Sequence, residues 1–495
     1  MKKSLLYILS SLLLMVAGGC SDDLNLSPIS NKNIEGFYKT QSQFEQAIIG
    51  CYHGLRNANL KSNFSYQLTE CRSDNAWQQV DYDDGMISRF TENAATPVLN
   101  TAWADLYNTV MRCNYILTRI EDATFDDEGV RKQIEGEARF VRALIYFDLV
   151  RYFRGVPIVD KPLTISEAYS VTRATEEEVY DFIISDLKAA IGLLPDVKPK
   201  ELPNRATVLA AKGFLGKVYV FQSGYPLNKN SWESAKGELE AVVNGIGQAG
   251  FFSKYEDIFL YENENKDQAV FSLGCQTNAQ GEGNPYPSRN APNGIKPGDT
   301  ELTVPFGGSP WQLFFDDEIL DDIFSEEGDE RRVYSIQTEW EEKSGSIITN
   351  KPFVRKYQNG PISAASDWDI DWIMLRYTDV YMLYAEALYH TNNQAGALDI
   401  INKVRIRAGL TALTSAAISS VDSFTDVLLK ERRREFCFEN QRWGDLVRTD
   451  RAFDVMKKFL SRYGIADNLK SKEQYFYPIP ERETNVSGIK SVSYT

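Results

Sequence analysis

Hydrophobic residues recur at three- and four-residue steps along much of the chain, and this spacing places them on one face of an α-helix. Three stretches show the pattern most clearly, at residues 44–55, 103–117 and 138–152. In the first of them, Phe44 and Ile48 are followed by further apolar residues up to Leu55. The pattern predicts a mainly α-helical protein.

A fourth predicted helix has a recognisable start and end. Thr175 stands three residues before Glu178, which is the spacing of a capping box at a helix N-terminus. The apolar residues that follow, from Val179 to Leu194, keep the helical period until Pro195 stops it.

Two later regions are predicted to form helix pairs, each close to the ~34 residues of a tetratricopeptide unit. Residues 209–221 precede 232–243, and residues 376–389 precede 395–404, with Gly, Pro or Asn in the turns. Small residues stand where the two helices of a pair must approach closely: Ala210, Ala211, Gly213, Gly216, Ala385, Ala387, Ala395 and Ala397. Helical repeats of this kind bury their faces against one another and leave a curved surface for binding.

Two irregular segments interrupt the helical pattern, at residues 276–311 and 350–371. The first is rich in Gly, Pro and Asn and contains Tyr286, while Trp368 lies in the second. A loop as long as the first, inside a compact protein, is usually functional, disordered or a sign of a misassigned element. Aromatic residues in loops on a rigid helical scaffold indicate a binding site.

The N-terminus is typical of an export signal. Lys2 and Lys3 precede an apolar run over residues 5–16, and small residues then lead to Cys20. The run is too short to cross a bilayer, which takes about 20 residues. The residues before Cys20 resemble a bacterial lipobox, although Ala17 stands where Leu is usual. We therefore expect a signal peptide at 1–19 and acylation of Cys20, which gives firm membrane attachment; the alternative is a secreted protein in which Cys20 is incidental.

Charge and cysteine content narrow the choice of partners. The formal net charge is -15, and loss of the signal peptide removes two lysines and makes it more negative. Such a balance repels nucleic acid, and it disfavours polyanionic ligands unless a local basic patch intervenes. The six cysteines lack the close spacing of a metal site or a disulfide framework.

Motifs of common enzyme and metal sites are absent from the sequence. There is no HExxH, GxSxG, Walker or GxGxxG motif, and His53 and His390 both lie in apolar helical stretches, where we expect them to pack. A pair of carboxylates remains the one enzymatic option, and the 69 acidic residues neither identify nor exclude it. We predict a protein that is not an enzyme and has no cofactor.

Two charged segments are predicted to be structural. Residues 81–85 are similar to a calcium loop, but the glycine falls one position early, so no metal is expected. In the run 430–435, Glu431 can pair with Arg434 and Arg432 with Glu435 at helical spacing.

Short segments spread over nearly all of the mature chain resemble, in their residues and in their order, segments of one known protein family. They are Leu24–Pro28, Phe37–Tyr38, Ala47–Arg56, Ser73–Asn75, Trp103–Leu117, Gly136–Ala143, Phe153–Pro157, Leu375–Val380, Ala385–Ala387, Glu431–Leu446 and Tyr477–Pro480. Together they resemble the SusD/RagB family of outer-membrane nutrient-binding lipoproteins of Gram-negative bacteria.

The resemblance implies one domain over residues 20–495, with an N-terminal part at about 20–225, a C-terminal part at about 226–495 and ligand-loop insertions at about 276–311 and 350–371. It implies four tetratricopeptide-like helix pairs decorated by loops and short strands. It further implies a surface-exposed lipoprotein that captures oligosaccharides and delivers them to a SusC-like TonB-dependent transporter, without catalysis.

The net charge favours a neutral oligosaccharide, and a neutral sugar offers hydroxyl groups for hydrogen bonds and a flat C–H face that packs on an aromatic ring. Two loops supply both kinds of partner, one after Ser73 and the other at 276–311. We expect ligand contact first from Trp77 and Trp311, then from these residues: Tyr286, Tyr82, Trp372, Asp74, Asn75 and Arg289. The alternative for each aromatic ring is burial, which we expect for Trp103, Trp232 and Trp443 on the helical stripes.

Other functions remain open at this point. An aromatic, amide-lined groove also suits a peptide or glycopeptide. A glycan-cleaving enzyme and a helical scaffold that binds only proteins are the remaining alternatives.

Overall fold

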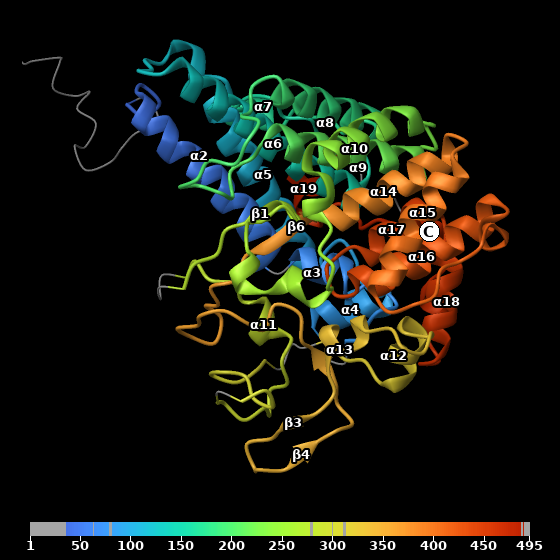
Figure 1. The fold of residues 1–495 in the computed structure, drawn as a ribbon. Coiled ribbons are helices and arrows are strands. Elements are labelled where there is room, and N and C mark those ends of the chain that lie inside the picture. Colours follow the sequence, from blue (N-terminus) through green and yellow to red (C-terminus); the bar gives the residue numbers. More distant parts are fainter. Residues whose placement is uncertain are drawn as a thin grey trace, which may run out of the picture.

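The computed structural model describes residues 36–62, 64–78, 82–277, 281–298, 300–309, 313–486 and 489. Most of this part of the chain folds into helices that stack side by side, with loops and short strands gathered at one end of the stack (Figure 1). The main helices are α2 Gln41–Arg56, α5 Pro97–Leu117, α6 Glu128–Phe153, α8 Glu176–Ile191, α9 Val208–Ser223, α10 Trp232–Ile246, α14 Tyr377–His390, α15 Gln394–Arg407 and α16 Val421–Phe436. The predicted mainly α fold is confirmed.

Shorter elements fill the connections. The short helices are α3 Phe64–Thr69, α4 Asp83–Arg89, α7 Ile165–Ala168, α11 Tyr286–Arg289, α12 Asp317–Ile323, α13 Arg331–Ser335, α17 Arg442–Arg448, α18 Ala452–Ser461 and α19 Glu481–Val486. The strands are β1 Ala269–Leu273, β2 Ile336–Gln337, β3 Trp340–Glu341, β4 Ile347–Ile348, β5 Phe353–Val354 and β6 Trp372–Arg376.

Local sequence explains where the helices begin and which face they bury. Thr175 caps α8, and its hydroxyl accepts a hydrogen bond from the backbone N–H of Glu178, as the capping box predicts. In α2 the apolar stripe buries Phe44, Ile48, Cys51 and Leu55 completely. One boundary differs from the prediction, because Arg376 ends strand β6 and the helix begins at Tyr377.

The long helices form four neighbouring pairs, α2 with α5, α6 with α8, α9 with α10, and α14 with α15. Glycines allow the closest approaches between elements. A Cβ on Gly216 of α9 would stand 2.5 Å from Cγ of Leu239 in α10, and one on Gly213 would stand 2.7 Å from Leu375. The small residues predicted at these positions are therefore required, because a larger side chain would clash with the neighbouring element.

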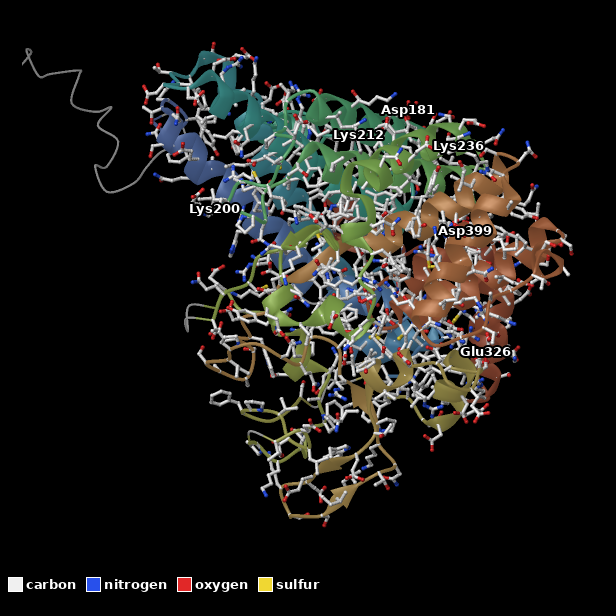
Figure 2. The ribbon with its side chains drawn as sticks, viewed as in Figure 1. Asp181, Lys200, Lys212, Lys236, Glu326 and Asp399 are labelled. Atoms are coloured by element: carbon white, nitrogen blue, oxygen red, sulfur yellow. The ribbon has the colours of Figure 1, made fainter. Side chains whose placement is uncertain are left out.

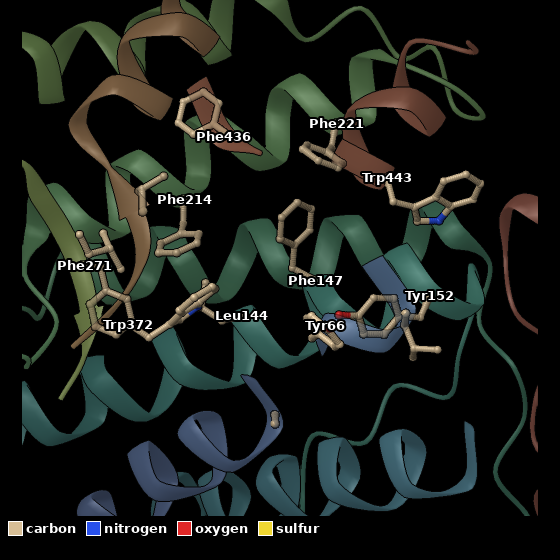
Figure 3. Packing of buried hydrophobic residues seen from close by; sticks show 14 of the residues in the cluster. Tyr66, Leu144, Phe147, Tyr152, Phe214, Phe221, Phe271, Trp372, Phe436 and Trp443 are labelled. Carbon is tan, nitrogen blue, oxygen red and sulfur yellow. The ribbon is translucent and has the colours of Figure 1, made fainter. Parts of the chain in front are cut away.

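A two-stranded antiparallel sheet lies beside α9 and joins distant parts of the chain. β1 pairs with β6, so that Ala269 faces Arg376 and Leu273 faces Trp372. Figure 3 shows Trp372 and Phe271 of this sheet in the same buried layer as Phe214 of α9. The sheet therefore belongs to the hydrophobic core.

Polar groups fix the loop that enters β6. The backbone N–H of Asp371 donates to Oε1 of Glu264 at 2.5 Å, and the Asp371 carboxylate accepts from Nδ2 of Asn204 at 2.6 Å. Burial, together with the charges of Asp371 and Asp369, raises the pKa of Glu264 to about 8.

Residues 431–435 of the charged run, at the end of α16, are buried rather than solvated, whereas Lys430 is exposed. Glu431 pairs with Arg434 at 3.5 Å, as predicted. The predicted pair of Arg432 with Glu435 is wrong, because Arg432 turns to Asp379 and Asp445, each at 2.8 Å. Helical spacing allowed the pair, but carboxylates from other helices lie closer.

Burial alone would raise the pKa of Glu435, but Arg407, Arg376 and Arg331 outweigh it and hold the pKa below its usual range. The carboxylate therefore stays charged in the core.

The remaining cysteine and histidine predictions concern packing. Five cysteines in the described part of the chain are free and buried. His390 stacks on Trp232 with 4.0 Å between ring centroids, so it packs as expected. Among the described residues, every helix is too short or too polar to span a bilayer.

The glycine contact in the helix stack can be tested by stability. Gly216→Ala should lower the free energy of unfolding by about 1–3 kcal/mol, since the new methyl group overpacks the α9–α10 interface. Exposed Gly237 of α10 has open space around its Cα, so Gly237→Ala should stabilise by up to about 1 kcal/mol through helix propensity. Urea denaturation of both variants measures the difference, and equal effects would contradict the packing argument.

The pKa of Glu264 predicts a pH dependence of stability. The folded-state value of about 8 lies above the unfolded-state value of about 4.3, so the native state binds the proton more tightly. The stabilisation is complete below about pH 4.3 and is lost as the pH rises through about 8. Glu264→Gln retains the acceptor oxygen and should flatten the decline in melting temperature between about pH 5 and about pH 9, whereas exposed Glu262→Gln should not. An unchanged slope in Glu264→Gln would disprove this assignment.

Candidate functional site

The two loops predicted to bind ligand meet in the structure. The backbone N–H of Trp77 donates to the carbonyl of Phe314 at 2.6 Å, and the N–H of Phe314 donates back to Trp77 at 2.9 Å. In α3, which precedes the first loop, the Tyr66 hydroxyl donates to Oδ1 of Asn290 on the second loop at 3.2 Å. We call the described residues of 73–83 and 276–314 the loop face.

The two polar residues of the first loop that were predicted to contact a ligand lie inside the protein. Asp74 is buried and accepts two hydrogen bonds from Arg442, at 2.7 and 3.0 Å. Burial would raise the pKa of Asp74, but Arg433 and Arg442 hold it well below its usual range. Asn75 is also buried, and its amide donates to Glu70 at 2.8 Å. The expectation that Asp74 and Asn75 contact a ligand does not hold in this structure, because their polar atoms are engaged inside the protein.

Two of the predicted aromatic residues belong to the core. Tyr286 and Trp372 are each 3% exposed, and their ring centroids lie 4.8 Å apart. The Tyr286 hydroxyl donates to the carbonyl of Phe438. This corrects the expectation of ligand contact. Both rings are buried because Trp372 lies in strand β6 and Tyr286 in α11, and both elements place these side chains in the core.

Arg289 is half-buried and acts within the scaffold. Its Nη1 donates to the carbonyl of Leu60 at 3.1 Å, near the end of the turn that follows α2. Burial lowers the pKa of its guanidinium, with Tyr66 and Asp84 acting in the opposite direction. The contact joins the second loop to the helix stack.

The other predicted aromatic residues are more accessible. Trp77 is half-buried and stacks on Tyr463, with 3.9 Å between centroids and 10° between planes. Tyr82 directly precedes α4 and is 63% exposed. Trp311 lies outside the described residues.

Sequence reasoning missed Phe306, which is 56% exposed on the second loop. It occupies the third position of a turn closed by a hydrogen bond from the N–H of Gly307 to the carbonyl of Val304, at 2.9 Å. Pro305 fixes the second position, and the φ of +63° at Phe306 is the one that glycine normally supplies in a type II turn. A non-glycine residue held there costs about 1–2 kcal/mol, and such strain clusters at functional sites. The Pro-Phe-Gly sequence was the available signal.

A cavity lies beside the first residues of the second loop, and sequence reasoning missed it too. This α2 pocket has a volume of about 710 Å³ and is formed by the outer face of α2, residues 201–205, the end of β1 and Glu282. Ile49 and Leu202 on its wall are 60% and 54% exposed.

Charges in the α2 pocket are mostly paired. Arg56 donates to Glu282, and Arg205 donates to Glu137 with Nε–Oε1 at 2.7 Å. Burial and the charge of Arg56 lower the pKa of His53, which is therefore neutral at pH 7. These walls suit an uncharged, partly apolar molecule.

Metal binding has no visible basis in the described part of the chain. No group of three or more His, Cys, Asp or Glu side chains there is placed to hold a metal ion. Asp83, from the segment similar to a calcium loop, instead accepts a hydrogen bond from the backbone N–H of Val98 at 2.8 Å.

Two family models match the chain. The model described as "SusD family" matches residues 300–490, and the one described as "Starch-binding associating with outer membrane" matches residues 24–220. A curated relative, SusD-like protein P38 of Formosa agariphila, is 26% identical over 478 residues, which cover 89% of this chain and 90% of that one.

Solved structures agree with these matches. One named "Laminarin binding SusD-like protein" is 25% identical, has a TM-score of 0.76 and covers 92% of this chain and 100% of its own. A SusD homolog from Bacteroides thetaiotaomicron superposes with a TM-score of 0.79 at 21% identity, over 93% of this chain and 98% of its own, and shows the same fold. With two family models, full-length relatives and the fold in agreement, the chain belongs to the SusD/RagB family.

Proposed function

We propose that this protein binds an oligosaccharide at the cell surface through its loop face. The observation that carries the proposal is the pair of exposed aromatic rings, Tyr82 and Phe306, on the two segments that the Trp77–Phe314 pairing joins. An exposed ring offers a flat apolar surface to the C–H face of a sugar. The exposed amide of Asn293 supplies a hydrogen-bonding group on the same loop.

Names of similar proteins support a glycan ligand. One solved relative is named as laminarin-binding and another, from Bacteroides thetaiotaomicron, as a surface glycan-binding protein. Both names describe binding and not catalysis, in line with a protein that is not an enzyme. A peptide or glycopeptide remains the second candidate, because the same rings and amides can hold an extended backbone.

The proposed setting is the outer membrane. One family model is described by association with that membrane. Acyl chains on Cys20, which lies outside the described residues, would attach the protein there. The bound oligosaccharide would then pass to a SusC-like TonB-dependent transporter, the partner that the family resemblance implies.

The loop face can be tested with the chain that lacks residues 1–20. Tyr82→Ala and Phe306→Ala should each weaken binding of the best oligosaccharide from a glycan array about tenfold, or about 1.4 kcal/mol. Both rings are exposed, so the midpoint of thermal unfolding should stay close to that of the parent chain. Calorimetry measures the affinities.

Tyr169→Ala is the matched control for this test, since Tyr169 is 56% exposed and lies at the C-terminal end of α7, outside the loop face. If all three variants bind like the parent chain, the loop face is not the site. Binding to peptides but to no glycan would favour the second candidate, and release of reducing ends from a bound sugar would indicate an enzyme.

The lipid anchor has a separate test. Cys20→Ala removes the thiol that would carry the acyl chains, so the protein should leave the outer-membrane fraction and become soluble after export. Fractionation and blotting compare it with the unchanged chain. Equal membrane retention in both would exclude Cys20 as the anchor.

A further inference from the structure

A second pocket concentrates positive charge on this acidic protein. It has a volume of about 380 Å³ and lies between α12, α16, α17 and α18, with seven cationic and three acidic side chains on its walls. The whole chain, by contrast, has a formal charge of -15. We call this cavity the basic pocket.

Several of its arginines already have partners. Arg433 donates to Asp322 at 2.7 Å, and together with Arg442 it holds Asp74. Arg434 donates at 2.6 Å to Glu326, which Figure 2 labels at the edge of the helical body. These groups form a rigid wall whose own charges are largely compensated.

Three cationic groups on the wall can still form an ion pair or a hydrogen bond with a ligand. Lys430 and Lys458 are exposed, and neither has an ion-pair partner within 4.0 Å among the described residues. Arg462 forms ion pairs with Glu318 through Nε at 3.1 Å and with Asp322 through Nη2 at 3.9 Å, while its Nη1 is buried without a hydrogen-bond partner in the described structure. An anion in the pocket would meet two ammonium groups and one guanidinium N–H, and charge-assisted bonds of this kind are the stronger ones.

The basic pocket adjoins the loop face. The ring of Phe459 forms part of its wall and lies 6.4 Å from the ring of Trp77, centroid to centroid. Arg462 precedes Tyr463, which stacks on the same Trp77. A molecule bound to the loop face near Trp77 would therefore lie close to the cationic groups of the basic pocket.

The geometry points to an acidic oligosaccharide as the ligand, with a carboxylate or sulfate group seated in the basic pocket between Lys430, Lys458 and Arg462. This inference rests on the proposed function and names the substrate class of that site. The negative net charge of the chain does not exclude an anionic ligand here, because the electrostatic field at the anion is set by groups within a Debye length of about 8 Å at physiological salt.

The experiment compares matched acidic and neutral probes on the chain without residues 1–20. Trigalacturonic acid is titrated beside its methyl ester, and a sulfated chondroitin disaccharide beside its unsulfated form. We expect at least one acidic probe to bind about tenfold more tightly than its neutral partner, and the preference to shrink when sodium chloride rises from about 0.05 M to about 0.5 M.

The double variant Lys430→Gln/Lys458→Gln should lose that preference while its affinity for the neutral probes stays unchanged. Lys39→Gln/Lys132→Gln is the matched control, because it removes the same charge from two exposed lysines, one just before α2 and one on α6. Inorganic sulfate alone serves as a third arm. Tight binding of free sulfate at this pocket, without preference among the sugars, would overturn an oligosaccharide in favour of a simple anion.

The outcomes separate the two proposals. If neutral and acidic probes bind equally, or if the double variant behaves like its control, the basic pocket has no role and the proposed function still stands. Failure of every acidic probe to bind overturns this inference, whatever the neutral probes do. If acidic probes bind through the lysines but neither Tyr82→Ala nor Phe306→Ala affects any sugar, the loop face fails instead.

Discussion

The structure depends most on the buried ion network around the C-terminal half of α16. Glu435 is fully buried and accepts hydrogen bonds from Arg376 at 3.0 Å and Arg407 at 2.5 Å, while Arg331 contacts Glu431 at 2.6 Å. Buried charges are tolerated only when they are paired and hydrogen-bonded, and loss of one partner typically costs about 3–5 kcal/mol. The network therefore allows few alternative arrangements of the segments that it joins, which are far apart in sequence.

This network also carries the base of the loop face. The Glu70 carboxylate accepts the backbone N–H groups of Phe438 and Asn440, at 2.9 and 3.0 Å, so the segment before Asp74 is tied to the chain after α16. Arg433 then reaches the Asp74 carbonyl at 2.6 Å. A binding loop held from below in this way can present rings without large rearrangement, which lowers the entropic cost of binding.

The candidate site was only partly predictable from the sequence. Loop composition identified two segments that meet in the structure, where Trp77 pairs with Phe314, three residues beyond the predicted loop 276–311. Which aromatic ring faces water was not predictable: Tyr286 and Trp372 are buried by β1, β6 and α11, whereas Phe306 is turned outward by a strained backbone. A side chain's burial depends on neighbours that are distant in sequence, and periodicity within a loop carries no information about them.

The sequence by itself determined the main helices, the capping box of α8, the apolar helix faces and the absence of common catalytic motifs, because each of these depends on residues within a few turns of one another. Only the tertiary structure decided how charges combine. Arg432 pairs with Asp379 and Asp445 and not with its helical neighbour Glu435. Lys430, Lys458 and Arg462 line the same pocket, although the protein as a whole is acidic. Electrostatic energy falls with distance in space and not with separation along the chain, so these pairings became visible only when the helices were in place.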